Sequence, residues 1–383
     1  MSALATFPQL LVRNAATFPS GVGVREKTHG IWQEHSWAQV QERVRALALG
    51  LVAQGFGRGG VLAVLGDNRP EWLFAELAAQ ALGGACLGVH PDVEPAALGP
   101  VLEACGATVA LAEGQEQVDK LLACGVPGLA RIVWCRPRGL RRYQHPSLQA
   151  LSLLEEQGRE LHARDPGRFA REVATGSVDE LAFLSAGPHG PDGGAPLRFT
   201  YRDLAALAAA LHAEGARGED AISFLPLSWP GEQAVSVQAA LACGFCVNFP
   251  ESPETTRADL HELGPQLLFA PPRLWEGVHQ WTLSRMAAAA PFNQWMFRAC
   301  LPIGAAAAAA REQGAVPPSL RLRHLLAELF FFWPLRDRLG FSRVRRASTG
   351  GAPLAPEVAG FLAAIGLTVS HAPVSAAAPP WGE

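Results

Sequence analysis

The chain has 383 residues, and its 32 lysines and arginines nearly balance 35 aspartates and glutamates to give a formal net charge of −3. So small a net charge excludes the strong long-range field that a nucleic-acid partner or an anionic membrane surface would favour. Hydrophobic residues make up 49% and charged residues 17%, which excludes disorder over most of the length and predicts two or three packed domains.

The basic residues are unevenly divided, because Lys27 and Lys120 are the only lysines and all the others are arginines. Chemistry that needs an ammonium group therefore has two candidates in the whole chain.

The seven cysteines are odd in number and lie mostly in apolar runs, which predicts reduced, buried thiols in a cytoplasmic protein. Cys243 and Cys246 form a C-x-x-C pair, but no second pair or histidine cluster accompanies them, so a redox or metal role is the minor alternative. The N-terminus lacks the pattern of a signal peptide, and the longest apolar run, residues 329–333, is too short for a membrane span.

From residue 60 onward, short apolar runs alternate with helical patterns. The expected strands are 61–65, 86–89, 108–111 and 132–134. The expected helices between them are 70–82, 96–105 and 116–122. Near-continuous apolar strands separated by helices of about ten residues indicate a parallel sheet with both faces covered.

An arginine-rich stretch, residues 136–171, shows helical patterns and no convincing strand, and the alternation then restarts. The expected strands are 181–184, 221–224, 245–249, 267–269, 344–348 and 367–370. The expected helices are 200–213, with Asp203 as capping-box partner of Thr200, then 232–243, 255–263 and 356–365, together with a long helical region from 275 to 339.

These elements predict an α/β protein with two stacked, doubly wound, mostly parallel sheets and covering helices. We divide the chain into a first α/β subdomain at 1–175, a second at 176–371, and a low-complexity tail at 372–383.

A Gly/Pro-rich loop, residues 186–196, follows the strand at 181–184 and is a candidate phosphate-binding turn. Ser185, just before the loop, is the only hydroxyl of this segment, which contains Gly187 and Gly190 but no lysine, and Asp192 adds negative charge. Arg198 is the nearest substitute cation, although its planar fork differs from an ammonium. A surface loop without ligand is the alternative.

Two further strand ends are candidates for a ligand pocket. Thr349, Gly350, Gly351, Ala352 and Pro353 form a turn in which glycines would let a flat ring approach the backbone, or simply a tight strand-to-helix connection. Trp229 and Gly231 follow another strand end and would line an apolar pocket, or belong to the core. No catalytic triad, metal-ligand spacing or carboxylate pair stands out, so we assign no catalytic or metal-binding residue.

Several segments in a consistent order resemble the AMP-forming acyl-CoA synthetases, specifically the long-chain fatty-acid–CoA ligases. The clearest stretches are 66–72 (Gly-Asp-Asn-Arg-Pro-Glu-Trp), 115–120 (Gln-Glu-Gln-Val-Asp-Lys), 271–276 (Pro-Pro-Arg-Leu-Trp-Glu) and 349–354 (Thr-Gly-Gly-Ala-Pro-Leu). The resemblance implies fatty-acid activation through an acyl-adenylate with ATP and Mg²⁺, followed by transfer to coenzyme A. It places residues 349–353 against the adenine, Ser185 to Arg198 at the phosphates, and Trp229 with Gly231 beside the acyl pocket.

The chain also departs from that family. The family's phosphate loop, roughly Tyr-Thr-Ser-Gly-Thr-Thr-Gly-x-Pro-Lys-Gly, has lost its later hydroxyls and its lysine, and about three extra residues precede 199–204. The family's Tyr-Gly-x-Thr-Glu motif, which supplies a magnesium-binding glutamate, falls on 373–377 and is absent. The β-barrel subdomain and the small C-terminal lid domain, with its lysine, are also missing, so coenzyme A is not expected to bind.

We therefore expect a truncated, catalytically impaired relative of a fatty-acyl-CoA ligase, because adenylation depends on stabilising phosphate charge. A non-catalytic module that binds a fatty acid or acyl-adenylate is the alternative, and an active enzyme with unusual groups is a third. A frameshift would also explain the tail. No nucleic acid or membrane span is expected, and an uncovered sheet edge favours self-association.

Overall fold

The computed structural model describes residues 4–186, 196–209, 211 and 213–372, so Gly187, Gly190 and the tail lie outside the described residues. Its contacts divide the chain into two compact units, which are described separately. Unit one comprises 1–209, 214–218 and 223–252, and unit two comprises 210–213, 219–222 and 253–383. The subdomain boundary expected at residue 175 stays a prediction.

The central feature of unit one is a seven-stranded sheet with the order β7-β6-β5-β3-β4-β8-β9, in which only β9 runs antiparallel to its neighbour. Its strands are β3 (Val61–Leu65), β4 (Ala85–Val89), β5 (Ala107–Ala112), β6 (Arg131–Trp134), β7 (Leu148–Ala150), β8 (Leu181–Ala186) and β9 (Leu197–Thr200). Strands β3 and β4 are buried at every position, as expected for parallel strands covered on both faces. The strands of this sheet were predicted except for β7 and β9, which are only three and four residues long.

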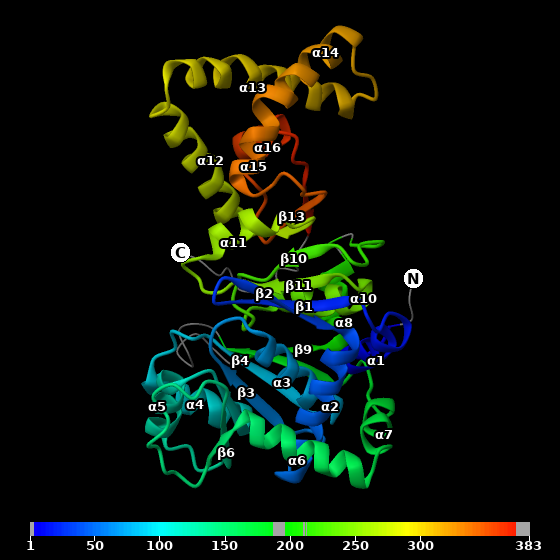
Figure 1. The fold of residues 1–383 in the computed structure, drawn as a ribbon, viewed down its shortest axis with the longest axis vertical. Helices are drawn as coiled ribbons and strands as arrows, with labels where there is room; N and C mark the ends of the chain where they lie inside the picture. Colours follow the sequence, from blue (N-terminus) through cyan, green and yellow to red (C-terminus); the bar gives the residue numbers. More distant parts are fainter. Residues whose placement is uncertain (1–3, 187–195, 210, 212, 373–383) are drawn as a thin grey trace. The chain divides into compact units, whose positions relative to one another are not determined.

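Helices cover both faces of this sheet (Figure 1). They are α1 (Phe7–Thr17), α2 (Trp37–Ala53), α3 (Pro70–Ala81), α4 (Pro95–Cys105), α5 (Gln115–Cys124), α6 (Leu151–Arg164), α7 (Arg168–Ala174) and α8 (Tyr201–Ala209). Helix α8 begins with the predicted capping box, since the Thr200 and Asp203 backbone N–H groups bond to each other's side chains at 2.8 and 3.2 Å. It ends at Ala209, before the predicted Ala213.

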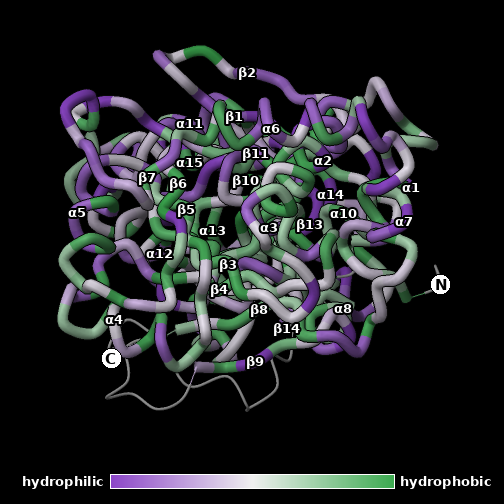
Figure 2. The backbone as a smooth tube through the Cα atoms, turned by 90° about the horizontal axis from the view of Figure 1, so that it is seen from below, coloured by the Kyte–Doolittle hydropathy of each residue, from purple (hydrophilic) through white to green (hydrophobic). Residues whose placement is uncertain are grey.

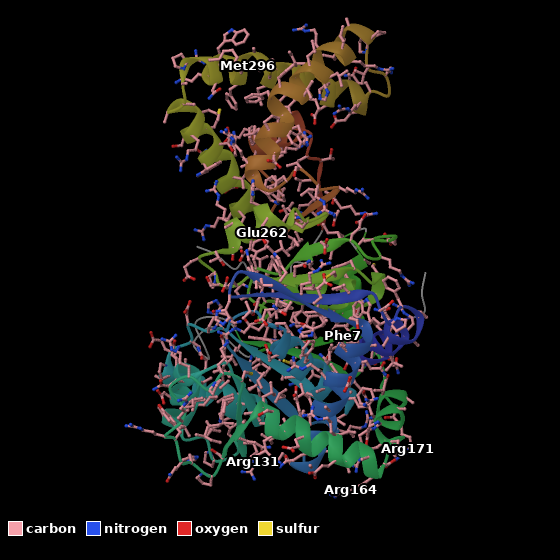
Figure 3. All side chains as sticks on the ribbon, in the orientation of Figure 1. Phe7, Arg131, Arg164, Arg171, Glu262 and Met296 are labelled. Atoms are coloured by element: carbon pink, nitrogen blue, oxygen red, sulfur yellow. The ribbon has the colours of Figure 1, made fainter. Side chains whose placement is uncertain are left out.

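Unit one also contains a hairpin that the sequence analysis, which began at residue 60, did not cover. Its strands are β1 (Val22–Thr28) and β2 (Ile31–Ser36), and β1 pairs in parallel with β11 (Cys246–Phe249). Figure 2 shows β2 as a hydrophilic edge, in agreement with its largely exposed residues. Figure 3 shows Arg164 and Arg171 among the surface side chains of this unit.

In unit one, the segment before β11 is helical, as predicted, but not uniformly α-helical. It consists of α9 (Pro230–Glu232), a π-helical stretch η2 (Gln233–Ala239) and α10 (Ala240–Cys243). A π-turn places side chains at positions that a regular α-helix would not, and such turns are frequent at functional sites.

Unit two contains four parallel strands in the order β14-β13-β12-β10. They are β10 (Asp220–Ile222), β12 (Leu267–Phe269), β13 (Arg346–Gly350) and β14 (Val369–Ala372). Its helices are α11 (Thr256–Leu263), α12 (Pro272–Ala287), α13 (Pro291–Glu312), α14 (Pro318–Ala327), η3 (Glu328–Phe332), α15 (Trp333–Leu339) and α16 (Pro356–Ala364). The strand pairing of both units confirms the predicted fold class of mostly parallel sheets with covering helices.

The long helical region of unit two is broken where prolines require it. Pro291 and Pro318 begin α13 and α14, and the residues before them are extended, with ψ values of 148° and 144°. The run α14–η3–α15 leaves large apolar side chains exposed along one face, namely Leu322, Leu325, Leu326, Leu329, Phe330 and Trp333.

Candidate functional site

In unit one, the structure brings together two of the predicted segments, the end of β8 and the loop before α9. The Ser185 hydroxyl is buried and donates a hydrogen bond of 2.8 Å to the Ser228 carbonyl oxygen. Gly88 pairs with Ser185 on the neighbouring strand, and a Cβ there would lie 2.7 Å from the Ser228 Cα. The loop can therefore lie directly on the carboxyl ends of β4 and β8, where open α/β sheets bind ligands.

The predicted acyl-pocket residues are adjacent in this loop. Pro230 begins α9, and the half-buried Trp229 indole folds over Gly231, where a Cβ would lie 2.6 Å from the ring. Glycine is thus required by the indole position, and the pair presents an aromatic surface next to the Ser185 strand end.

Two side-chain amides hold the loop in place. Asn68, just before α3, donates to the Ser223 hydroxyl at 3.0 Å and accepts from the Leu227 N–H at 2.9 Å. Gln233 donates to the Leu227 carbonyl oxygen at 2.8 Å and to Glu76 at 3.0 Å. These hydrogen bonds tie the loop to residues of other elements, and together they hold it in the observed conformation.

Two fully buried carboxyl groups complete this network, and sequence reasoning missed both. Burial raises the pKa of Glu232 to about 7, although the Ser223 and Ser236 hydroxyls, which donate to it at 2.6 and 2.5 Å, oppose the rise. Burial likewise raises the pKa of Glu76 to about 7, against hydrogen bonds from Gln233 and Gln80. The position of Glu76 among the apolar residues in the middle of α3 was the available sequence signal.

Arg198 is not brought to Ser185. It is paired across β8–β9 with Leu184, whose side chain belongs to the apolar cluster under α4 and α5. Its positive charge acts on the Cys105 thiol, which packs against that same cluster, whereas Ser185 faces the loop at Ser228. Successive strand residues point to opposite faces, so the two side chains lie on different sides of the sheet.

In unit two, residues 349–353 lie at the carboxyl end of β13, whose last two residues are Thr349 and Gly350. Gly351 adopts the left-handed region with φ of +90°, and no atom lies within 4 Å of the position of a Cβ. The Thr349 hydroxyl is buried and has no hydrogen-bond partner among the described residues. An open glycine beside an unsatisfied buried hydroxyl fits a planar ligand that carries a hydrogen-bonding group. Ala352 and Pro353 are exposed.

Within residues 4–186, 196–209, 211 and 213–372, no group of three or more His, Cys, Asp or Glu side chains is arranged to hold a metal ion. Cys243 and Cys246 are not joined by a disulfide, and no described helix is long and apolar enough to cross a membrane.

Comparison with solved structures identifies the fold. The adenylation domain of a carboxylate reductase from Mycobacterium chelonae superposes with a TM-score of 0.67 at 18% identity, covering 98% of this chain and 58% of that one. The corresponding domain from Segniliparus rugosus, in complex with AMP and a co-purified carboxylic acid, gives a TM-score of 0.63 at 16% identity, covering 98% and 61%. The fold is therefore that of the adenylate-forming enzymes.

The sequence comparison then gives the family. Residues 11–373 match the model of the AMP-binding enzymes, and the chain belongs to this family. It is similar to the long-chain-fatty-acid–CoA ligases ACSBG2 of Xenopus laevis, with 22% identity over 95% of this chain and 50% of the relative, and FadD15 of Mycobacterium bovis, with 27% identity over 89% and 55%. The chain thus spans about half the length of these curated relatives.

Proposed function

We propose that this chain binds a fatty-acyl group and the AMP part of an acyl-adenylate, but catalyses adenylation weakly. The observation that carries the proposal is the distribution of its cations. The loop between β8 and β9 contains no lysine in the sequence, and the two lysines of the chain are used elsewhere in unit one. Lys120 contacts Glu116 and the Pro91 carbonyl oxygen, both at 2.9 Å, and Lys27 lies over the Trp32 ring.

The binding half of the proposal is supported by groups that are present. Trp229 and Gly231 offer an aromatic surface at the end of β8, and Thr349 with Gly351 offers an open turn with an unsatisfied hydroxyl. When ATP and Mg²⁺ bind to a family member, they supply the phosphoryl electrophile and its charge neutralisation. This chain's contribution would be to orient the acyl chain and the nucleotide base.

The weak-catalysis half follows from electrostatics. Negative charge develops on the phosphates during adenylation, and each missing donor or cation commonly costs about 10² or more in rate. Residues 190–193 read Gly-Pro-Asp-Gly, against x-Pro-Lys-Gly in the family pattern, so a carboxylate stands where the family has an ammonium.

Pyrophosphate release with a long-chain fatty acid and ATP tests both halves. The unmodified chain should turn over slowly, and Asp192→Lys should raise the rate by about 10-fold or more. Glu156→Lys, an exposed position on α6, is the charge-matched control and should have no effect. Calorimetry with a non-hydrolysable acyl-adenylate should show saturable binding that Thr349→Val weakens. Rapid turnover of the unmodified chain contradicts impaired catalysis, and a flat titration contradicts the binding module.

A further inference from the structure

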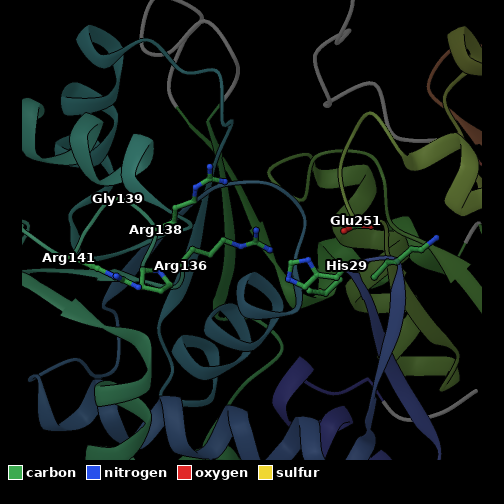
Figure 4. Close-up of a pocket in the computed structure, with 9 residues that line it drawn as sticks. His29, Arg136, Arg138, Gly139, Arg141 and Glu251 are labelled. Carbon is green, nitrogen blue, oxygen red and sulfur yellow. The ribbon is translucent and has the colours of Figure 1, made fainter.

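Unit one contains a cavity away from the segments of the candidate site described above. Its volume is about 630 Å³, and it lies between the tip of the β1–β2 hairpin and the loop after β6. Figure 4 shows side chains from both segments facing this space, with Glu251 on the hairpin side. The lining residues are Lys27, Thr28, His29, Arg136, Pro137, Arg138, Gly139, Arg141 and Glu251.

The lining is strongly cationic, although the whole chain has a slight negative charge. Four lysine and arginine side chains face one carboxylate, that of Glu251. Arg138 and Arg141 are exposed, and among the described residues neither side chain takes part in a hydrogen bond or ion pair. These two guanidinium groups are therefore available to a ligand.

Two nearby carboxylates, those of Glu26 and Glu113, offset only part of this charge, because two arginines share them. Arg69 lies behind the cavity with its nitrogens 2.6 Å from both Glu26 and Glu113. Arg136 reaches the same two carboxylates only at 3.9 and 3.7 Å. Arg136 is thus held in direction by Glu26 and Glu113 and shares them with Arg69, so the positive charge left for a ligand comes mainly from Arg138 and Arg141.

The Glu251 carboxylate stabilises the turn of the β1–β2 hairpin. His29 and Gly30 both adopt left-handed backbone conformations, with φ of 51° and 75°, and the Gly30 N–H donates to the Glu251 carboxylate at 3.1 Å. This bond fixes the turn that carries His29 to the edge of the cavity. The Glu251 carboxylate therefore holds the hairpin side of the cavity in place, and the arginines of the loop after β6 form the opposite side.

We propose that this cavity binds a small molecule that carries a diphosphate group. Guanidinium forks bind phosphate oxygens in pairs, and three arginines on one short loop offer more donors than a single phosphate would need. The volume lies within the range of about 300–1,000 Å³ typical of small-ligand sites. In this proposal, arginines of the β6–β7 loop bind the anion, and this binding does not depend on the nucleotide contacts proposed for residues 349–353.

Calorimetry of the full chain with pyrophosphate, at low ionic strength, tests the proposal. We expect saturable binding with one molecule per chain, which weakens as salt is added. Arg138→Ala and Arg141→Ala should each weaken it by about 10-fold or more. Arg142→Ala removes the same charge from an exposed position of the same loop that does not line the cavity, and should leave the affinity unchanged.

Two comparisons separate this site from the nucleotide site and identify the source of the diphosphate. Thr349→Val should leave pyrophosphate binding unchanged even if the proposed function fails. If ADP binding weakens in Arg138→Ala, the site accepts a nucleotide-borne diphosphate; if it does not, the site takes the smaller anion. Absence of saturable pyrophosphate binding, or equal weakening by Arg142→Ala and Arg138→Ala, would overturn the proposal.

Discussion

The buried carboxyl of Glu232 should make unit one less stable as the pH rises. Burial raises its pKa from 4.5 to about 7, so the native state binds this proton more tightly than the unfolded state does. The contribution of this carboxyl group to the free energy of unfolding is therefore fully present below pH 4.5 and is lost as the pH rises through 7. A shift of about 2.5 pH units at 1.36 kcal/mol per unit corresponds to about 3 kcal/mol at pH 8 and above.

Glu232→Gln isolates this effect, because the amide oxygen still accepts hydrogen bonds from the Ser223 and Ser236 hydroxyls but cannot ionise. We expect the variant to exceed the parent in free energy of unfolding by up to about 3 kcal/mol at pH 8 and to differ little at pH 5. Urea denaturation at both pH values measures this. Glu76 remains in both proteins, so its contribution cancels, and Glu156→Gln serves as the exposed control. An equal difference at both pH values would refute the reasoning.

Three further outcomes follow from the same structure. Asn68→Ala should lower the free energy of unfolding by about 1–3 kcal/mol, measured by urea denaturation, because it removes the hydrogen bonds that hold the loop before α9. Gly88→Ala should lower the free energy of unfolding by a similar amount, because a Cβ there would lie 2.7 Å from the Ser228 Cα and from the Phe183 ring. Gly57→Ala, with open space around the new Cβ, is the control and should be neutral by the same assay. The double change Leu325→Ser and Phe330→Ser should reduce self-association, measured by light scattering against concentration, because these side chains are 62% and 65% exposed; an unchanged profile would show that this face is not responsible.

Much of the fold could be predicted because its strands are locally encoded. The strands β3–β6 are mostly apolar and are separated by helices with clear starts, such as Pro70 at the first position of α3. What the sequence did not reveal was which sheet each strand joins. Strand β8 follows a polar stretch, and no local pattern shows that it pairs with β4 in the same sheet as β3. Strand order depends on tertiary packing, and no local pattern specifies it.

The segments that form the candidate site could be predicted from the sequence, but the contacts between their residues could not. The strand ends at Ser185, Trp229 and Thr349 follow from the rule that ligands bind at the carboxyl ends of parallel strands. That Ser185 bonds to the loop before Trp229, or that Arg198 faces Cys105, depends on the register and face of β8 and β9. The basic cavity escaped prediction for a related reason, since Lys27 and Arg138 are far apart in sequence and neither carries a recognised motif.

The network in unit one also bears on what the family resemblance can mean. Asn68, Glu232 and Gln233 lie in or beside the segments that resemble the ligases, and each is occupied in holding the loop or its supporting helix. Residues with such structural roles would be needed in a binding module as much as in an enzyme, so their presence does not discriminate between the two. The positions that would discriminate are those for which the proposed function assigns a ligand partner. Under that proposal Thr349→Val tests nucleotide binding and Asp192→Lys tests phosphate chemistry, and both leave the network intact.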